Sequence, residues 1–285
     1  MLYTAFWMPS FVYFDTDFFH RFSAAFEHRP LAEDLRDKIL LSPMTMKEVF
    51  SHLAVEWGPD VHRQIKSLPN WLSTKARHLP WMSDAIGWIA LGVPLPKDDD
   101  FTRGLEENIH DLLNYELDDV LAAAKSIRDQ LDKIKTEYAG HFKDTVDYFR
   151  THPLTEFDEI WATGIRNRID VKKAPSTVQI VADLSAYHEF EFSKLQVALA
   201  NKDYNIEKHR NDLFDAEQLV YMKDPALHFL TADRGYLRKV VKSPFRDRIH
   251  EVPGKLLADP DKLETVLRQI VVPPAVVPTA LTTTP

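Results

Sequence analysis

Two short apolar segments near opposite ends of the chain each run directly into an aspartate. Phe11–Phe14 is followed by Asp15-Thr16-Asp17, and His228-Phe229-Leu230 is followed by Thr231-Ala232-Asp233. Short apolar, aromatic runs of this kind are typical of buried strands. In an open parallel α/β sheet, ligands bind beyond the carboxyl ends of the strands. The pattern therefore predicts a parallel sheet with carboxylates gathered at one edge.

Carboxylates that share one sheet edge repel each other unless a cation joins them. The oxygens of Asp and Glu are also the ligands that Mg²⁺ and Mn²⁺ prefer. Asp15 and Asp233 therefore predict a divalent-metal site.

Strand and helix patterns alternate around these two segments. Strands are predicted at 11–14, 39–42, 229–231 and 249–252, and helices at 17–26, 46–55 (with Thr45 as its cap), 209–222 and 235–241. This β-α-β-α alternation predicts a parallel sheet with helices on its faces. The expected fold class is α/β, a three-layer α/β/α arrangement with a short parallel sheet, built from residues 1–56 and 205–258.

Residues 57–204 have a different character and are expected to form a mostly α-helical insertion. They begin rich in Trp and Pro, and a helical pattern follows over 103–149, with a second helix at 181–200. From Leu117 to Tyr138, apolar residues recur in steps of three and four, which is a heptad pattern. Because it covers only about three heptads, it favours a helix hairpin packed within one chain over a dimerising coiled coil. The segment 270–285, rich in Pro and Thr, is predicted to be disordered.

Composition narrows the function classes. The chain of 285 residues has no cysteine, which excludes disulfides and cysteine-rich zinc sites and is compatible with a cytoplasmic location. A net charge of -8 argues against non-specific coating of nucleic acid. No apolar run is long enough to span a bilayer, so no membrane partner is expected, and the apolar N-terminus is interpreted as a first strand. Glycine is scarce, and no Gly-rich phosphate loop is present.

Further acidic residues stand close to the predicted strands. Glu48 occurs in Thr45-Met46-Lys47-Glu48, in what is expected to be the first turn of a helix. Asp212 and Asp215 are three residues apart at the start of the helix before the second strand–Asp segment, so they share a face. Each of these acids alone is explained as a helix cap, because acids at helix starts complement the helix dipole.

Taken in order, these segments resemble the motifs of the PIN-domain nucleases. The four segments are Phe14-Asp15-Thr16-Asp17, Thr45-Met46-Lys47-Glu48, Asp215-Ala216 and Thr231-Ala232-Asp233. The resemblance covers about residues 8–56 and 205–255. Asp17 stands where the family usually has Asn, and the long middle segment is unlike the compact members.

The resemblance implies a metal-dependent nuclease, in the first place an endoribonuclease that hydrolyses single-stranded RNA in the cytoplasm. It implies that Asp15, Glu48, Asp215 and Asp233 bind Mg²⁺ or Mn²⁺, with Asp17 and Asp212 as further candidates and Thr16 and Thr231 orienting the carboxylates. Two such ions can clamp the attacking and leaving oxygens of a phosphodiester. A protein partner of the antitoxin type is a further expectation, and the oligomeric state stays open.

Basic residues flank the acidic segments and are expected to contact phosphates. The candidates are Arg210, Arg234, Arg238 and Lys239, with Lys208, His209 and Lys242 beside them. Phosphate contacts dominate affinity for nucleic acids, although any one of these residues taken alone is better explained as part of a solvated helix face.

Two other interpretations stay open. Asp15-x-Asp17 also resembles the haloacid-dehalogenase-type phosphatases, in which the first Asp is a covalent nucleophile, but Phe19 stands where that motif continues to a Thr or similar residue. The other is a PIN-like module that binds RNA or assembles with a partner without catalysis.

Overall fold

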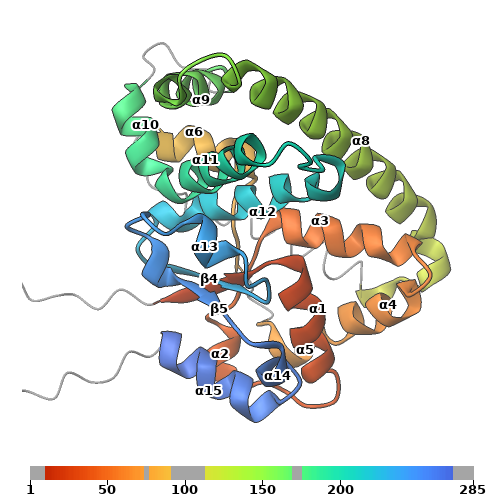
Figure 1. The fold of residues 1–285 in the computed structure, drawn as a ribbon. Helices are drawn as coiled ribbons and strands as arrows, with labels where there is room; N and C mark the ends of the chain where they lie inside the picture. Colours follow the sequence, from red (N-terminus) through yellow and green to blue (C-terminus); the bar gives the residue numbers. More distant parts are fainter. Residues whose placement is uncertain (1–9, 74–76, 91–112, 169–174, 272–285) are drawn as a thin grey trace, which may run out of the picture.

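The computed structural model describes residues 10–73, 77–90, 113–168 and 175–271 of the chain. These residues form a mixed α/β structure that is mostly helical around a small parallel sheet (Figure 1). The strands are β1 (Phe11–Phe14), β2 (Leu40–Leu41), β3 (Arg77–His78), β4 (Leu227–Thr231) and β5 (Ile249–Glu251).

All strand pairs are parallel, as the alternating pattern predicts. β4 lies between β1 and β5, and β2 pairs with β3. A parallel bridge between Val12 and Ile39 brings the residue before β2 alongside β1, which gives the spatial order β3-β2-β1-β4-β5. The strand order reverses between β1 and β4. In sheets of this kind, the crevice at the carboxyl ends of those two strands is the usual place for a ligand.

The strands bury both of their faces. Val12 and Phe14 contribute to one hydrophobic cluster, and Tyr13, between them, contributes to a second one. Successive side chains of a strand point to opposite sides, so the two clusters lie on the two sides of the sheet. Runs that are apolar without alternation are expected for such doubly covered strands.

Helices from both ends of the chain cover the first face. They are α1 (Thr16–Ala25), α2 (Glu33–Arg36), α3 (Pro43–Ser51), α4 (Gly58–Lys66), α5 (Leu68–Trp71), α14 (Gly254–Leu257) and α15 (Pro260–Val271). The phenyl rings that α1 presents at four-residue spacing pack with Phe14 and the fully buried Trp71. The predicted helix 17–26 is therefore confirmed, and its aromatic stripe is core.

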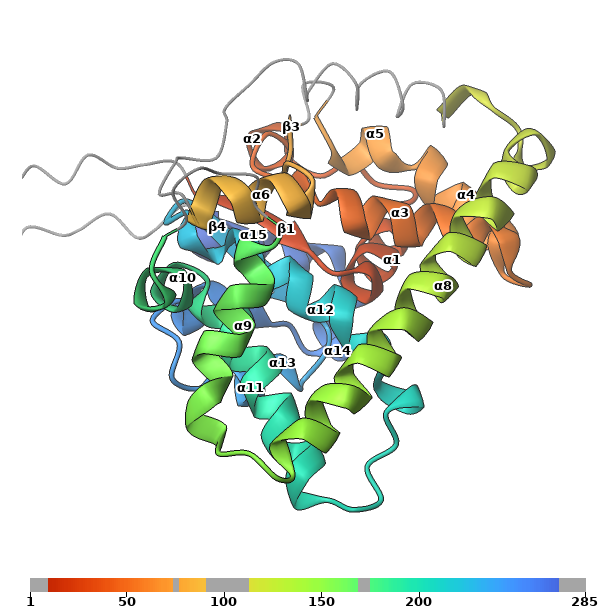
Figure 2. The same ribbon diagram turned by 90° about the horizontal axis from the view of Figure 1, so that it is seen from above.

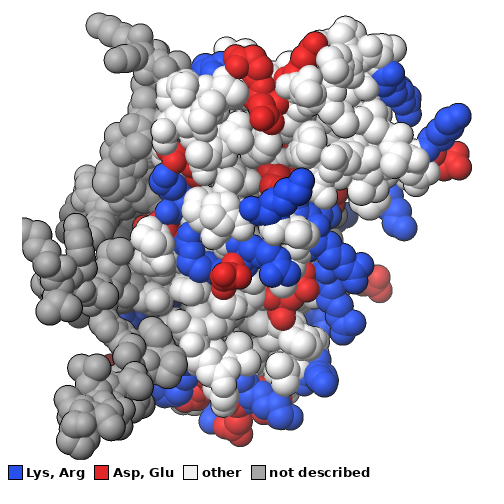
Figure 3. All heavy atoms as spheres, turned by 60° about the vertical axis from the view of Figure 1, so that its left-hand side comes forward, with Lys and Arg blue, Asp and Glu red and all other residues white. Residues whose placement is uncertain are grey.

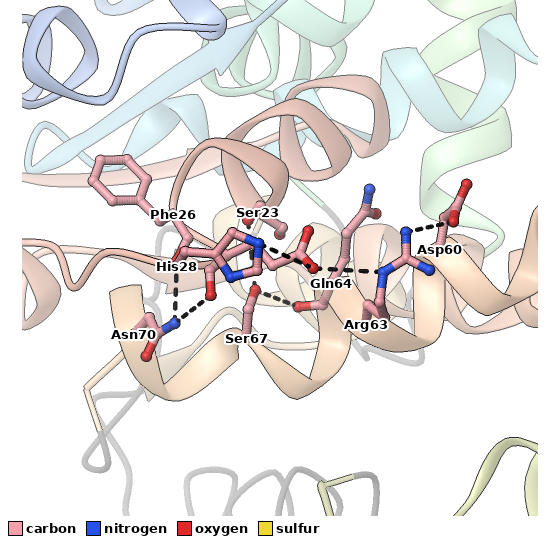
Figure 4. Close-up of polar contacts among 9 residues, drawn as sticks. Ser23, Phe26, His28, Asp60, Arg63, Gln64, Ser67 and Asn70 are labelled. Atoms are coloured by element: carbon pink, nitrogen blue, oxygen red, sulfur yellow. Dashed lines mark hydrogen bonds and ion pairs between the residues drawn. The ribbon is translucent and has the colours of Figure 1, made fainter.

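The carboxyl end of α1 is fixed by polar contacts with α4 and α5 (Figure 4). The Asn70 side-chain amide donates to the carbonyls of Phe26 and Glu27 at 3.2 and 2.9 Å. The Ser67 hydroxyl lies 3.5 Å from the carbonyl oxygen of Ser23. These contacts satisfy carbonyls that a helix end leaves unpaired.

The second face is covered by α6 (Met82–Ala90), α9 (Phe157–Arg166), α10 (Thr177–Asp183), α11 (Ser185–Ala200), α12 (Asp212–Gln218) and α13 (Tyr236–Lys239). The single helix predicted at 181–200 is wrong in its start, because α10 and α11 are separate helices that meet at Leu184. The helix predicted at 209–222 is α12 continued by the 3-10 segment Leu219–Lys223. Other 3-10 segments are His52–Ala54, Leu154–Glu156, Glu207–His209 and Arg246–Arg248.

The heptad segment forms the first part of α8 (Leu117–Phe149), one continuous helix of 33 residues that crosses the other elements (Figure 2). Val120 and Ala124 pack into the first cluster, and Leu131 packs with Leu213 and Phe214 of α12. The heptad segment packs within its own chain, as expected, and the helix at 181–200 supplies one partner through α11. The other partners of α8 are α3, the 3-10 segment His52–Ala54 and α12, so the packing is not that of a simple hairpin.

The expected insertion shares the core of the flanking segments. Residues 57–204 supply β3 to the sheet and buried side chains to both clusters. The boundary at residue 57 therefore does not separate two hydrophobic cores.

Helix ends differ from the sequence predictions at two places. α3 begins at Pro43, so Thr45 does not cap it and Glu48 lies beyond its first turn. Proline at the first helical position needs no amide hydrogen, which explains the earlier start. At the other end of the chain, α15 extends to Val271, and the predicted disordered tail otherwise falls on 272–285, outside the described residues.

Candidate functional site at the carboxyl ends of β1 and β4

Asp15 lies where the strand order reverses. It follows β1 directly and caps α1, because its Oδ1 accepts a hydrogen bond from the Phe18 amide at 2.7 Å. Its own amide lies 3.3 Å from the carbonyl oxygen of Leu230 in β4. Asp is among the residues that best satisfy the free amides of a helix start. The local sequence therefore places this carboxylate at the sheet edge.

Thr231 joins the ends of the two strands. Its hydroxyl donates to Asp15 Oδ2, and it accepts a hydrogen bond from the Asp233 amide at 2.9 Å. The Thr231 side chain is fully buried. It therefore fixes the direction of the Asp15 carboxylate.

Asp215 of α12 faces the same edge from the second side of the sheet. Burial, followed by the charges of Glu48 and Asp15, raises the pKa of Asp215 to about 8. Burial also raises the pKa of Asp15 to about 7, against the hydrogen bonds from Thr231 and Phe18 that lower it. A raised carboxylate pKa means that the charged form is not compensated by its surroundings. The two carboxylates thus form an uncompensated acidic pair.

Glu48 of α3 lies near this acidic pair, but its carboxylate has its own partners, a hydroxyl and an ammonium. The Thr16 hydroxyl donates to Glu48 Oε2 at 2.7 Å, and Lys135 Nζ lies 3.4 Å from Glu48 Oε1. Lys135 comes from α8, and its ammonium also lies 4.9 Å from the centre of the Phe214 ring. Sequence reasoning missed Lys135, because nothing local distinguishes it from the other lysines of a long polar helix.

Asp233 and Asp17 lie at the margin of the site. Asp233 is exposed, and its Oδ1 accepts from the Gly235 amide at 2.8 Å, which shapes the turn before α13. Asp17 is exposed and forms an ion pair with Arg21 one helical turn further on, at 3.0 Å. Their charges still raise the pKa of Asp15, as the smallest contributions.

Asp212 is engaged by cations rather than facing the acidic pair. Its Oδ2 lies 3.6 Å from Lys194 Nζ, 3.7 Å from Lys239 Nζ and 3.7 Å from His209 Nδ1. Lys194 is buried on α11 and also donates to the Tyr138 hydroxyl of α8. Asp212 therefore ties α12 to α11, α13 and α8, which is a structural role.

Tyr236 is a second residue that sequence reasoning missed. Its side chain is fully buried, and its hydroxyl has no hydrogen-bond partner of good geometry among the described residues. Burial raises its pKa far above the usual value, and the charges of Asp215 and Asp15 raise it further. A phenol that keeps its proton beside two carboxylates can donate a hydrogen bond into the site.

The predicted phosphate contacts separate into two groups. Lys239 lies within the site, where its charge lowers the pKa of Asp215, and Arg210 Nη2 lies 3.5 Å from Asp132 of α8. Arg234 and Arg238 are exposed, as are Lys208 and Lys242. One face of the molecule carries a band of Lys and Arg side chains with Asp and Glu among them (Figure 3).

Within the described ranges, no three His, Asp or Glu side chains lie close enough together to hold a metal ion in their present rotamers. No described helix is long and apolar enough to cross a membrane. Comparisons with protein-family models, with curated proteins and with solved structures found no match to this chain.

Proposed function

We propose that the chain is a metal-dependent phosphodiesterase with a three-layer, PIN-like α/β/α fold, acting as an endoribonuclease on single-stranded RNA in the cytoplasm. The observation that carries this proposal is the acidic pair Asp15 and Asp215. The two carboxylates come from elements far apart in the sequence, and the charge of Asp15 contributes to the raised pKa of Asp215, so the two lie close enough to repel each other. Such a pair is stabilised by a bound cation.

In donor chemistry, though not in their present spacing, the residues of the site suit a hard divalent cation. All the candidate ligands are oxygens: Asp15, Asp215, Glu48 and Asp233, with the Tyr236 hydroxyl beside Asp215. Oxygen ligands suit Mg²⁺ and Mn²⁺. When bound, such an ion would lower the pKa of a water and neutralise charge on the phosphate oxygens.

The remaining residues of the site hold the carboxylates in place or bring positive charge near them. Thr231 and the Phe18 amide hold the Asp15 carboxylate, and Thr16 holds Glu48. Lys239 lies 3.7 Å from Asp212 and Lys135 lies 3.4 Å from Glu48, so each ammonium is held near the site, where it can turn towards a phosphate. Phosphate contacts of this kind give affinity without sequence preference.

Metal removal tests the proposal directly. We expect end-labelled single-stranded RNA to be cut internally in Mg²⁺ or Mn²⁺ and to stay intact after treatment of the protein with EDTA. Adding Mn²⁺ back should restore cleavage, since the ion supplies the activated water.

Two other results would favour a different function. RNA that is bound but never cut in either metal would favour the non-catalytic module. Dephosphorylation of a small phosphomonoester, with a fluoride mimic of the acyl-phosphate trapped on Asp15, would favour the phosphatase.

The Lys135→Met protein is expected to bind Mn²⁺ about threefold to tenfold more tightly. The Lys135 ammonium neutralises Glu48 at 3.4 Å, so an arriving cation must compete with it. A partly buried ion pair of this kind contributes on the order of 1 kcal/mol. Calorimetric titration of Mn²⁺ into the metal-free proteins measures the change without any activity.

Lys133→Met is the matched control for this titration. Lys133 lies on the same helix with 78% of its side chain exposed and pairs with Glu137. Its affinity for Mn²⁺ should equal that of the wild type. Unchanged or weaker Mn²⁺ binding by Lys135→Met would show that the ion does not bind beside Glu48.

A further inference from the structure

Two contacts of α1, one with α3 and one with the 3-10 segment that follows α3, lie one helical turn apart. Thr16 bonds to Glu48, and four residues further along each segment His20 Nε2 lies 2.9 Å from His52 Nδ1. Four residues of helix advance about 6 Å. The histidine pair therefore stands about 6 Å along α1 from the Thr16–Glu48 contact, comparable to the length of one nucleotide.

The imidazoles of His20 and His52 form an uncharged, hydrogen-bonded pair. His20 Nδ1 lies 2.7 Å from Gln64 Oε1, an atom that can only accept, so His20 donates there and accepts from His52 at its other nitrogen. The rings lie side by side, with an interplanar angle of 26° and centroids 5.2 Å apart. Burial lowers the pKa of His20, and burial together with the charge of His20 lowers that of His52 to about 4, so both rings are uncharged at neutral pH.

The Trp57 ring packs against the two imidazoles at an angle, at 80° to the His20 ring and 54° to the His52 ring. Its ring centroid lies 4.9 Å from that of His52 and 5.2 Å from that of His20, yet 44% of the residue is exposed. It follows the 3-10 segment His52–Ala54 that connects α3 towards α4, where α8 crosses (Figure 2). The cluster of three aromatic rings is thus mostly buried at His20 and His52 and exposed to solvent at Trp57.

A guanidinium binds the backbone just before Trp57. Arg128 of α8 donates from Nη1 to the carbonyl of Ala54 at 3.2 Å, three residues before Trp57. That bond uses one of the five hydrogens that a guanidinium can donate, and the Arg128 side chain lies on the exposed side of α8. Arginine in this position can bind a phosphate oxygen.

We propose that Trp57, supported by His52 and His20, is a stacking subsite for one nucleobase of a single strand, with Arg128 holding the adjoining phosphate. The inference rests on the proposed function, because the subsite serves a strand whose phosphodiester lies at the acidic pair. The exposed, uncharged Trp57 ring is a platform for a base, and the guanidinium bound to Ala54 is available for its phosphate. Only an unpaired strand can offer a base face to such a platform.

The test measures affinity apart from cleavage. Fluorescence anisotropy of labelled oligouridine and oligodeoxythymidine is recorded with Asp15→Asn protein, which is expected to leave the strands intact. Adding Trp57→Ala should weaken binding of both oligonucleotides about 5-fold to 100-fold, the usual contribution of one stacked base. Trp57→Phe should retain most of the affinity, because a phenyl ring still stacks.

Trp81→Ala is the matched control. Trp81 is 46% exposed, almost the same as Trp57, but it precedes α6 on the second face of the sheet. Its loss should leave both affinities unchanged, and near-ultraviolet circular dichroism checks that each variant keeps its packing.

The possible outcomes distinguish a failure of the subsite proposal from a failure of the proposed nuclease function. If RNA is bound and cut by the wild type while Trp57→Ala binds it as tightly as Trp81→Ala does, the subsite is wrong and the nuclease stands. If the wild type binds neither oligonucleotide, the subsite and the proposed substrate class both fall. Weaker binding of RNA alone would mean that the platform reads the ribose as well as the base, and would support the subsite.

Discussion

Replacing Asp15 by Asn is expected to reduce metal-dependent cleavage of single-stranded RNA by more than about 100-fold. Mutating a residue that only supports a metal ligand reduces activity by up to about 100-fold, so losing a ligand itself should cost more. Asp15 stands at the crevice between β1 and β4, and Thr231 and the Phe18 amide already fix its direction. Asparagine keeps the shape of the side chain and the oxygen that caps α1. It removes the negative charge that attracts the cation.

Asp17→Asn is the control for this loss, because Asp17 lies two residues away, is exposed and pairs with Arg21. Cleavage rates at saturating Mn²⁺ should change far less in that protein. Single-turnover cleavage of one labelled RNA by both variants makes the comparison. Full activity of Asp15→Asn would exclude Asp15 as a metal ligand and with it the proposed site.

The metal-free protein is expected to lose stability as the pH rises from about 5 to 9, and Asp215→Asn should remove part of this loss. The pKa of Asp215 is raised from 3.8 to about 8 by burial and by the charges of Glu48 and Asp15. The unfolded chain ionises near pH 4, whereas the folded protein keeps the proton until about pH 8. Asp215 therefore stabilises the fold fully below the unfolded pKa, and this stability is lost as the pH rises through the folded pKa.

Each unit of pKa shift corresponds to roughly 1.4 kcal/mol, so Asp215→Asn should be more stable than the wild type by a few kcal/mol at pH 9 and equal to it near pH 4. Urea unfolding in EDTA at several pH values measures the difference. Asp144→Asn, a change at an exposed position of α8, should follow the wild type throughout. A constant difference between Asp215→Asn and the wild type across this pH range would mean that Asp215 is already compensated in the folded protein.

The parts of the fold that the sequence predicted are those set by local pattern. An apolar run followed by Asp specifies a strand that ends on a helix cap, and this is how Asp15 reaches the sheet edge. The same pattern predicts β4 and the position of Thr231 at its end. Strand and helix periodicity is a property of neighbouring residues, so it can be followed along the sequence.

The helix boundaries were predicted less well where packing competes with local preference. Thr45 could cap a helix, yet α3 begins at Pro43 and the Thr45 hydroxyl donates to the Phe14 carbonyl at 2.8 Å instead. The heptad pattern of α8 indicated a helix and an apolar stripe. It did not indicate which elements would cover that stripe, because several helices of the chain present apolar faces of similar size.

The sequence by itself determined the parallel α/β pattern and placed Asp15 and Thr231 at strand ends. Only the tertiary structure decided which of the carboxylates are paired with cations and which are not. It paired Asp212 with lysines and Asp17 with Arg21, brought Lys135 to Glu48, and left Asp15 and Asp215 as the uncompensated pair. The physical reason is that a carboxylate's pKa depends on burial and on charges within a few ångströms, which come from helices distant in the chain.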